Sequence, residues 1–297
     1  VVQFPEGERE VEVLNDYTPV KPGIDIYVKG SVVGTPDESF FLMDVIRVNG
    51  LIWLALIFIA ITLLVSKLKG FYALVGLLFS FAVIFSYVIP AILGGSSPVT
   101  AGLVGSLLIL VVAIYASHGF NKKSLSAILG IGLTLIIVGL MANYFTQILY
   151  FTGYGGEESL YLNQESDIPL DLIGLVVAGI IIAAIGILDD IAITQASIVF
   201  RLRKANADLG TRELFVHAMD VGKDHIAAVI NTLTLAYLGA ALPLLLLLSL
   251  QNFPLAFTIN NELIAEEIAR TIIASSGLIL AVPITTLIAV WFSKLED

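Results

Sequence analysis

The chain has 297 residues, of which 58% are hydrophobic and only 13% are charged, and its formal net charge is -10. An ordinary soluble domain carries about 25% charged residues and has no core that hides repeated apolar runs of about 20 residues, so the composition predicts an integral membrane protein. The sequence has no cysteine, which excludes disulfides and thiolate catalysis, and its negative charge argues against a nucleic-acid partner.

The first fifty residues differ in character from the rest of the chain. Three stretches are rich in β-branched and aromatic residues, as strands are: 11–14, 24–33 and 40–48. Turn signals lie between them, namely Pro22-Gly23 and Thr35-Pro36-Asp37. We therefore expect a small β-rich segment over residues 1–50. Three short strands bury little apolar surface, so it should pack on the membrane part or pair with a partner.

Residues 51–297 are dominated by apolar runs close to the length of a membrane crossing. There are seven: Leu51–Val65, Phe71–Leu93, Val99–Ser117, Leu125–Phe151, Leu170–Phe200, Ile226–Leu250 and Thr271–Phe292. The predicted fold is an all-α polytopic membrane bundle of about seven transmembrane helices, preceded by a small N-terminal extracytoplasmic β-rich segment.

The charges between these runs predict an orientation. Basic residues recur at every second break: Lys67 and Lys69, Lys122 and Lys123, the group from Arg201 to Lys223, and Lys294. By the positive-inside rule these breaks lie in the cytoplasm, so residues 1–50 and the acidic loop 157–171 lie outside and the C-terminus lies inside. A translocated front segment needs a signal or anchor, which the opening Val1-Val2-Gln3-Phe4 does not supply, so we expect a further hydrophobic segment upstream in the full-length gene product.

The fifth apolar run contains an acidic pair. Helical spacing places Asp190, Thr194, Ser197 and Arg201 on one stripe, with Asp189 and Gln195 beside it. Asp189 lies 19 residues after Leu170, about 28 Å along a helix. Adjacent carboxylates in an apolar medium suit reversible protonation or cation binding. The alternative is a structural role, in which the two acids cap a helix or pair with Arg201 and Lys223.

A second polar stretch opens the sixth run. Asp220, Asp224 and Asn231 share one helical face, and we expect this face to turn towards Asp189 and Asp190. His225 has the chemistry to titrate near neutral pH or to bind a metal, but a single histidine beside an aspartate at a membrane entry is more typical of an interfacial hydrogen bond. No metal site is therefore predicted.

A third polar stretch precedes the last run. Glu262, Glu266 and Arg270 follow one another at intervals of four residues, and a glutamate four residues before an arginine is in the favourable order for a helical ion pair. Two interpretations remain open: an outward mouth lined by carboxylates, or a solvated helix start held by salt bridges.

These polar segments resemble the YibE/F family of bacterial membrane proteins. The resemblance rests on the segments GILDDIAITQAS (186–197), RELF (212–215), VGKDHI (221–226), NTLTLAY (231–237), ELIAEEIART (262–271) and AVP (281–283). It covers roughly residues 40 to 295. The family typically has another helix ahead of its outer segment. The resemblance implies a multi-pass protein of the bacterial cytoplasmic membrane, of a family usually presumed to transport something.

The leading functional prediction is a proton- or cation-coupled transporter or permease. Asp189 and Asp190 are its expected coupling site, lined by Thr194, Asp224 and Asn231. No P-loop is present in the sequence, and we expect neither a cofactor nor enzymatic activity. The expected partners are the lipid bilayer, a small solute or ion, and a second copy or another membrane subunit. Two alternatives stay open: a non-catalytic assembly or sensory protein acting through its outer segment, and an intramembrane hydrolase using Asp190 with Asp224.

Overall fold

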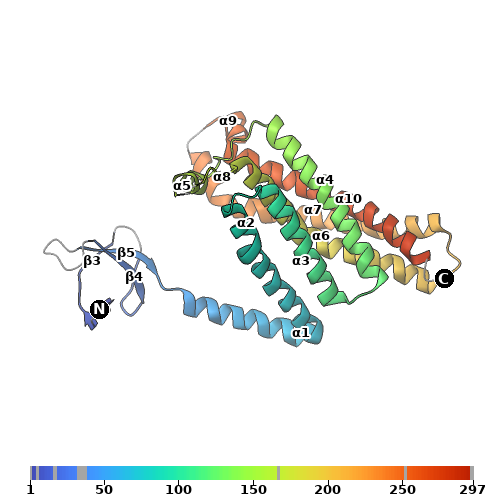
Figure 1. Cartoon of the computed structure of the whole chain (residues 1–297), viewed down its shortest axis with the longest axis horizontal. Coiled ribbons are helices and arrows are strands. Elements are labelled where there is room, and N and C mark those ends of the chain that lie inside the picture. Colours follow the sequence, from blue (N-terminus) through green and yellow to red (C-terminus); the bar gives the residue numbers. More distant parts are fainter. Residues whose placement is uncertain are drawn as a thin grey trace. The chain divides into compact units, whose positions relative to one another are not determined.

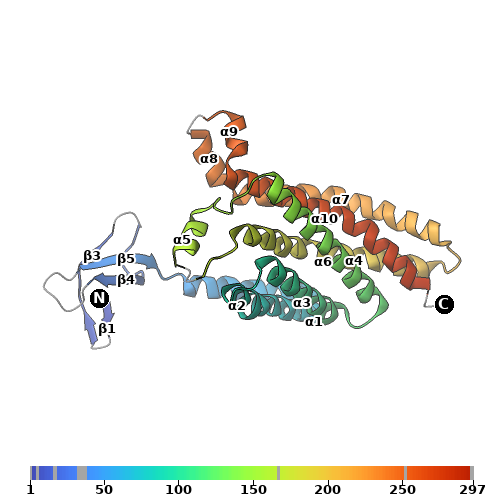
Figure 2. The ribbon, with the colours of Figure 1, turned by 45° about the horizontal axis from the view of Figure 1, so that its top comes forward.

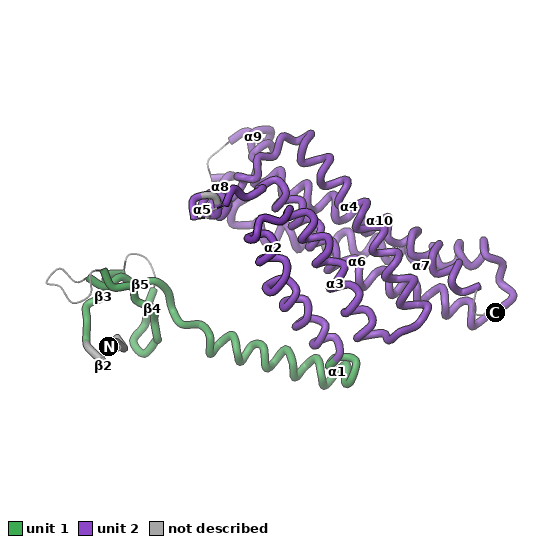
Figure 3. Tube along the Cα trace, viewed as in Figure 1, with its two compact units in different colours: residues 1–71 green, residues 72–297 purple. Residues whose placement is uncertain are grey.

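The computed structural model describes residues 2–4, 7–15, 19–31, 39–165, 168–250 and 253–294. It divides into two compact units, Val1–Phe71 and Tyr72–Asp297, which Figure 3 draws in green and purple. The last strand of the chain's first part ends at Val45 and the first helix begins at Val48, whereas the boundary between the compact units falls after Phe71, inside that helix.

The first unit begins with two small sheets. Strands β1 (Val2–Phe4) and β2 (Gly7–Arg9) form an antiparallel pair. The second sheet has the order β3-β5-β4, built from β3 (Val13–Leu14), β4 (Ile26–Ser31) and β5 (Ser39–Val45). β5 is antiparallel to β4 and parallel to β3. The predicted strands are therefore present, and the β1–β2 pair was not predicted.

Local backbone chemistry explains two features of this unit. Gly23 has a φ of 88° at the expected Pro22-Gly23 turn, a conformation that glycine adopts without a steric penalty. The other expected turn, at residues 35–37, lies outside the described residues. Where β5 ends, the backbone N–H of Val45 and the side chain of Arg47 hydrogen-bond Asp44 and hold its pKa below the ordinary value of 3.8.

Helix α1 (Val48–Val83) contains the first predicted break between membrane runs. Lys67 has a φ of 50° and a ψ of -129°, which interrupts the helix at the basic stretch. Beyond Val83 a π-helical turn η1 (Ile84–Val88) leads into α2 (Ile89–Leu93). Pro90 lacks the N–H that a regular α-helix needs, which favours such a local change in hydrogen bonding.

The second unit is a bundle of long helices (Figure 1). Its further elements are α3 (Pro98–His118), α4 (Lys122–Ile148), α5 (Glu157–Glu165), α6 (Leu172–Ala205), α7 (Thr211–Ala240), α8 (Leu242–Leu250), α9 (Leu255–Asn260) and α10 (Glu262–Ser293). Asn121 caps α4 by accepting from the N–H of Ser124, and Asp171 caps α6 by accepting from that of Gly174. Figure 2 shows α10 running beside α4 and α7.

Glycines bring the central helices close together. Gly102 of α3 lies against Ala178 of α6, and Gly139 of α4 lies against Ile181 of α6. Two further contacts, Gly130 with Thr285 and Gly277 with Val138, join α4 to α10 in one antiparallel register. Small residues at such crossings let helices pack closely without a hydrophobic driving force, as membrane helices must.

The number of membrane crossings follows from helix length and composition. Within the described ranges, five helical segments are long and apolar enough to cross a membrane: Val48–Leu93, Pro98–His118, Lys122–Ile148, Leu172–Ala205 and Glu262–Ser293. A sixth is formed if α7 and α8, bent by 59° where they meet, are taken as one span. The predicted count of seven is therefore not confirmed, because two expected spans share the segment 48–93. Its 46 residues measure about 69 Å as a helix, enough for two crossings of a core about 30 Å thick.

The outer faces of the bundle helices agree with an apolar surrounding. Leu140 of α4 is 65% exposed, and Leu287 of α10 is 58% exposed. Large apolar side chains are uncovered on every long helix of the second unit, which is an arrangement that water does not tolerate over such an area. The fold is accordingly that of a multi-pass helical membrane protein.

Candidate functional site

The polar stripe of α6 lies on a face of that helix that no described residue of the second unit covers. Asp190, Thr194 and Arg201 are exposed, and Ser197 is half-buried. The opposite face, which includes Leu188, is buried against the rest of the bundle. The four residues thus share a face, as their spacing predicts, and that face points away from the core.

The open stripe continues towards the start of α6 with small residues. A Cβ built on Gly179 or Gly186 meets nothing within 4 Å. The stripe therefore has room in front of it for another helix, lipid or water over much of the length of α6. We use the name α6 stripe for Gly179, Gly186, Asp190, Thr194, Ser197 and Arg201.

The acidic pair is not neutralised by a neighbour. Asp189 is half-buried and Asp190 is exposed. Across the described part of the chain, neither carboxylate has an ion pair or a hydrogen bond. The structural interpretation named Arg201 and Lys223 as their partners, but Lys223 instead pairs with Asp220, with 2.9 Å between Nζ and Oδ1.

Helix register gives the depth of the acidic pair. Gly139 of α4 contacts Ile181 of α6, and the two helices run antiparallel. Asp189, eight residues after Ile181, is therefore level with Ile131, eight residues before Gly139. Ile131 lies nine residues after Lys122, the first residue of α4, which is about 13 Å along the helix axis. Along the helix axis the pair therefore lies well away from the ends of the bundle, on the half that carries the basic breaks, and Asp190 faces outwards from the bundle.

Gln195 has a different place from the one that its sequence position suggested. It is 2% exposed, and its Nε2 donates to the backbone oxygen of Ala218 on α7 and to Thr286 Oγ1 on α10, each at 2.8 Å. Thr286 in turn donates to the backbone oxygen of Val282 at 2.6 Å. Gln195 thus joins three helices, and both of its donor hydrogens are used in doing so.

The polar face of α7 does not meet the acidic pair. Gly222 is the residue of α7 that faces α6, because a Cβ there would lie 3.0 Å from Gln195 Oε1. Asn231 is nine residues from Gly222, half a turn away at 100° per residue, and Asp220 and Asp224 lie near it. All three are exposed. The expectation that this face turns towards Asp189 and Asp190 is therefore wrong, since the packing face of α7 is formed by its small and apolar residues.

His225 lies at the edge of the packing face of α7 and is half-buried. Over the described residues, no group of three or more histidine, aspartate or glutamate side chains is arranged to hold a metal ion. His225 therefore has no ligand partners for such a role in this part of the chain.

The acidic start of α10 is organised by the loop that follows α4. Glu262 accepts hydrogen bonds from the N–H and hydroxyl of Thr152 and from the N–H of Gly153, the last at 2.9 Å. The ion pair at this end joins Arg270 to Glu267, at 3.4 Å, three residues apart. The ion pair is thus not the i, i+4 pair of Glu266 with Arg270 that the spacing favours, and Glu266 is buried, at 8% exposure.

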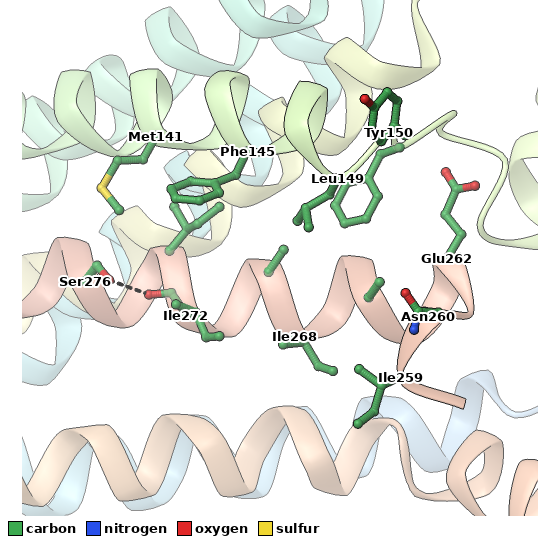
Figure 4. Close-up of a pocket in the computed structure, with 14 residues that line it drawn as sticks. Met141, Phe145, Leu149, Tyr150, Ile259, Asn260, Glu262, Ile268, Ile272 and Ser276 are labelled. Atoms are coloured by element: carbon green, nitrogen blue, oxygen red, sulfur yellow. Dashed lines mark hydrogen bonds between the residues drawn. The ribbon is translucent and has the colours of Figure 1, made fainter. Parts of the chain in front are cut away.

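Two pockets flank the same end of α10. One, of about 600 Å³, lies between α4 and α10 (Figure 4), with Met141 and Ser276 at one end and Tyr150, Asn260 and Glu262 at the other. The second, of about 560 Å³, lies between α7 and α10 and includes Tyr237 and Glu267. Both are lined mainly by apolar side chains, and neither includes Asp189, Asp190, Asp224 or Asn231.

Sequence reasoning missed the residues that hold these parts together. Thr286 and Gly222 give no local signal, because a threonine or glycine in an apolar run is ordinary. The loop with Gly153, Gly155 and Gly156 does carry a signal: three glycines in four residues indicate close backbone approaches. Gly153 has a φ of 78° and lies against the backbone of Leu172.

Comparison with known proteins identifies a family. The model of the YibE/F-like protein family matches residues 54–295 of the chain. No curated protein and no solved structure matches the chain.

Proposed function

The chain belongs to the YibE/F-like family, and we propose that this multi-pass membrane protein is a proton- or cation-coupled transporter of the bacterial cytoplasmic membrane. Asp189 and Asp190 on α6 are its coupling site. Its substrate is a small solute or ion. The single observation that carries the proposal is an acidic pair at the middle of a long apolar helix, with no cationic side chain paired to it among the described residues.

Energetics explain why such a pair favours function over structure. Each charged group near the centre of a membrane helix disfavours insertion by about 2.5 to 3.5 kcal/mol. An ion pair or a cap would reduce this penalty, but neither acid has such a partner among the described residues. Leu or Ala would serve packing better at both positions. The acids are therefore explained by a mobile positive charge that binds to them and leaves.

The α6 stripe supplies a route for that charge. Thr194 and Ser197 continue the polar surface over about three turns from Asp190 to Arg201, which lies at the basic end of the helix. Because this face has no cover within the chain's second unit, a second copy or another membrane subunit closes the route on its open side. Asp224 and Asn231 do not line it, since they lie on the outward face of α7.

The orientation proposed for the transporter follows its basic residues. Arg203 and Lys204 occupy the last turn of α6, and Lys122 begins α4 at the same end of the bundle. With these residues in the cytoplasm, the acidic start of α10 and residues 1–50 lie outside, the pocket of Figure 4 lies in the outer half of the bundle, and the C-terminus lies inside.

The two other functions are supported less well. A passive assembly or sensory protein predicts that its acids are paired and the bundle is closed over them, whereas Asp189, Asp190 and Asp224 lack partners in the described residues. A hydrolase of the aspartyl type needs two acids that meet. Asp190 and Asp224 lie on uncovered faces of different helices and are not brought together, so we propose no enzymatic activity.

Coupled flux tests the proposal. Proteoliposomes with an imposed pH gradient are challenged with a panel of inorganic cations, anions and small organic acids, and a pH-sensitive dye follows the gradient. We expect at least one solute to dissipate the gradient with the natural protein, and the double variant Asp189→Asn, Asp190→Asn to abolish that response. Asp208→Asn, in the exposed loop after α6, is the matched control and should behave like the natural chain. Equal responses from the double variant and the natural protein would refute the proposal, as would a panel without any response.

A further inference from the structure

Glu266 differs from the other acids at the start of α10. Glu262 is hydrogen-bonded to the loop after α4, and Glu267 is paired with Arg270. Glu266 is 8% exposed, and its Oε1 has no hydrogen-bond partner among the described residues. This oxygen needs an explanation, because burying a carboxylate oxygen without a hydrogen bond is costly by several kcal/mol.

The backbone of a glycine loop covers this carboxyl group. A Cβ built on Gly155 would lie between 2.9 and 3.1 Å from the Cδ, Oε1 and Oε2 atoms of Glu266. No other residue type fits at position 155 without displacing the carboxyl group. Glu262, which lies one turn before Glu266 on α10, holds this loop in place by accepting hydrogen bonds from Thr152 and Gly153. Glu266 is therefore enclosed by a loop that the hydrogen bonds of Glu262 hold in place.

The charges around Glu266 do not neutralise it. On α10, Glu262 and Glu267 repel a negative charge at Glu266, and Arg270 attracts it. Glu262 also forms a side-chain hydrogen bond with the Glu266 carboxyl group, which two carboxyl groups make only when a proton lies between them. Arg270 already pairs with Glu267. From the neighbouring elements, Glu158 of α5 lies beside Gly156, and Asp171 of α6 is engaged as a helix cap. The second pocket brings Tyr237 of α7 next to Glu267.

The described residues around Glu266 do not form a metal-binding site, since no group of three acidic or histidine side chains is positioned to hold a metal ion. The remaining small positive species is a proton, which removes the charge and needs no further ligands. We propose that Glu266 is a proton-binding site, occupied at neutral pH beneath the Gly155 cover and reached from solution when the loop 149–156 lifts. A proton adds to one carboxylate oxygen and leaves again, without any change of oxidation state.

This site goes beyond the proposed coupling at α6. It lies at the opposite end of the bundle from Arg201, and it holds whether or not Asp189 and Asp190 drive transport. The two proposals therefore fail separately, because the flux test leaves Glu266 unchanged and the test of Glu266 reads protonation rather than flux.

Infrared spectroscopy of the full chain in lipid nanodiscs tests the site at neutral pH. A protonated carboxyl group gives a C=O stretching band that a carboxylate does not. We expect Glu266→Gln to remove one carboxyl group's share of that band, whereas Glu267→Gln, a half-buried and ion-paired neighbour, leaves it intact. The same band in Glu266→Gln and the natural protein would overturn the proposal.

A second variant keeps the test decisive if Glu266→Gln does not fold. Gly155→Ala pushes the loop away from the carboxyl group and exposes it to water. The frequency of the band should therefore shift, and the carboxyl group should lose its proton, and with it the band, at a lower pH than in the natural protein. Gly179→Ala, with open space in front of its Cβ, is the control and should leave the band unchanged. An unshifted band in Gly155→Ala would count against the site. Loss of the band on adding sodium at constant pH would also overturn the proposal, because it would assign the site to a metal cation.

Discussion

Replacing Gly222 by alanine tests the helix junction around Gln195. The added methyl group would lie 2.6 Å from Val282 Cγ1 and 3.0 to 3.1 Å from the Gln195 amide. Val282 is fully buried and stiff because it is β-branched, so it cannot turn aside. The Gln195 amide is held by its bonds to Ala218 and Thr286, so it resists displacement as well.

The expected size of the effect follows from these contacts. Overpacking a tight core costs about 1 to 3 kcal/mol. Each hydrogen bond lost by Gln195 adds about 0.5 to 1.5 kcal/mol. Alanine recovers about 1 kcal/mol through its higher helix propensity. We therefore expect Gly222→Ala to lower the free energy of unfolding by about 2 kcal/mol, as the balance of overpacking, bond loss and propensity.

The measurement is unfolding in mixed micelles with increasing SDS, followed by far-ultraviolet circular dichroism. Gly179→Ala is the matched control, because it makes the same change in a helix interior without a neighbour within 4 Å. In a Gln195→Ala background, Gly222→Ala should destabilise less, since half of the obstruction is gone. If Gly222→Ala were as stable as Gly179→Ala, the junction would not be packed as described.

Three further predictions follow from the other parts of the structure. Glu262→Ala removes the acceptor for Thr152 and Gly153, so limited proteolysis should cut the loop 149–156 faster than in the natural protein. Glu157→Ala is the control, and equal rates for Glu262→Ala and the natural protein would show that Glu262 does not hold the loop. Lys223→Ala breaks only the exposed pair with Asp220, so the free energy of unfolding should change by less than about 1 kcal/mol, and a larger loss would show a hidden role for this pair. Cysteines placed at Asn206 and Tyr154 should be labelled by a membrane-impermeant reagent from opposite sides of oriented vesicles, and labelling from one side would refute the orientation.

Periodicity alone predicted the polar part of the α6 stripe. Helical geometry decides which residues share a face, so Asp190, Thr194, Ser197 and Arg201 were grouped correctly. The same rule does not say which neighbour covers a face. The polar face of α7 was expected to turn inwards, but packing against Gln195 and Val282 requires the small side of the helix, with Gly222 in the contact.

Contacts between distant segments explain the other differences. The spacing of Glu266 and Arg270 favours an ion pair in an isolated helix. In the folded chain the loop after α4 covers Glu266, and Arg270 turns to Glu267. A loop more than 100 residues away in sequence decides this pairing, as the bond of Thr152 to Glu262 shows. Local patterns do not contain such information, although the glycines of the loop indicate that a close approach occurs there.

The most direct test of the coupling site asks whether the α6 stripe is in contact with water. The natural chain has no cysteine, so single cysteines can be introduced without a background reaction. Impermeant thiol reagents attack the thiolate, which forms in water and not in lipid. We predict that Asp190→Cys, Thr194→Cys and Ser197→Cys react, whereas Leu287→Cys on the apolar outer face of α10 and Ala192→Cys in the core do not. If the stripe positions were as unreactive as Leu287→Cys, the stripe would face lipid and the account of Asp189 and Asp190 as a coupling site would be contradicted.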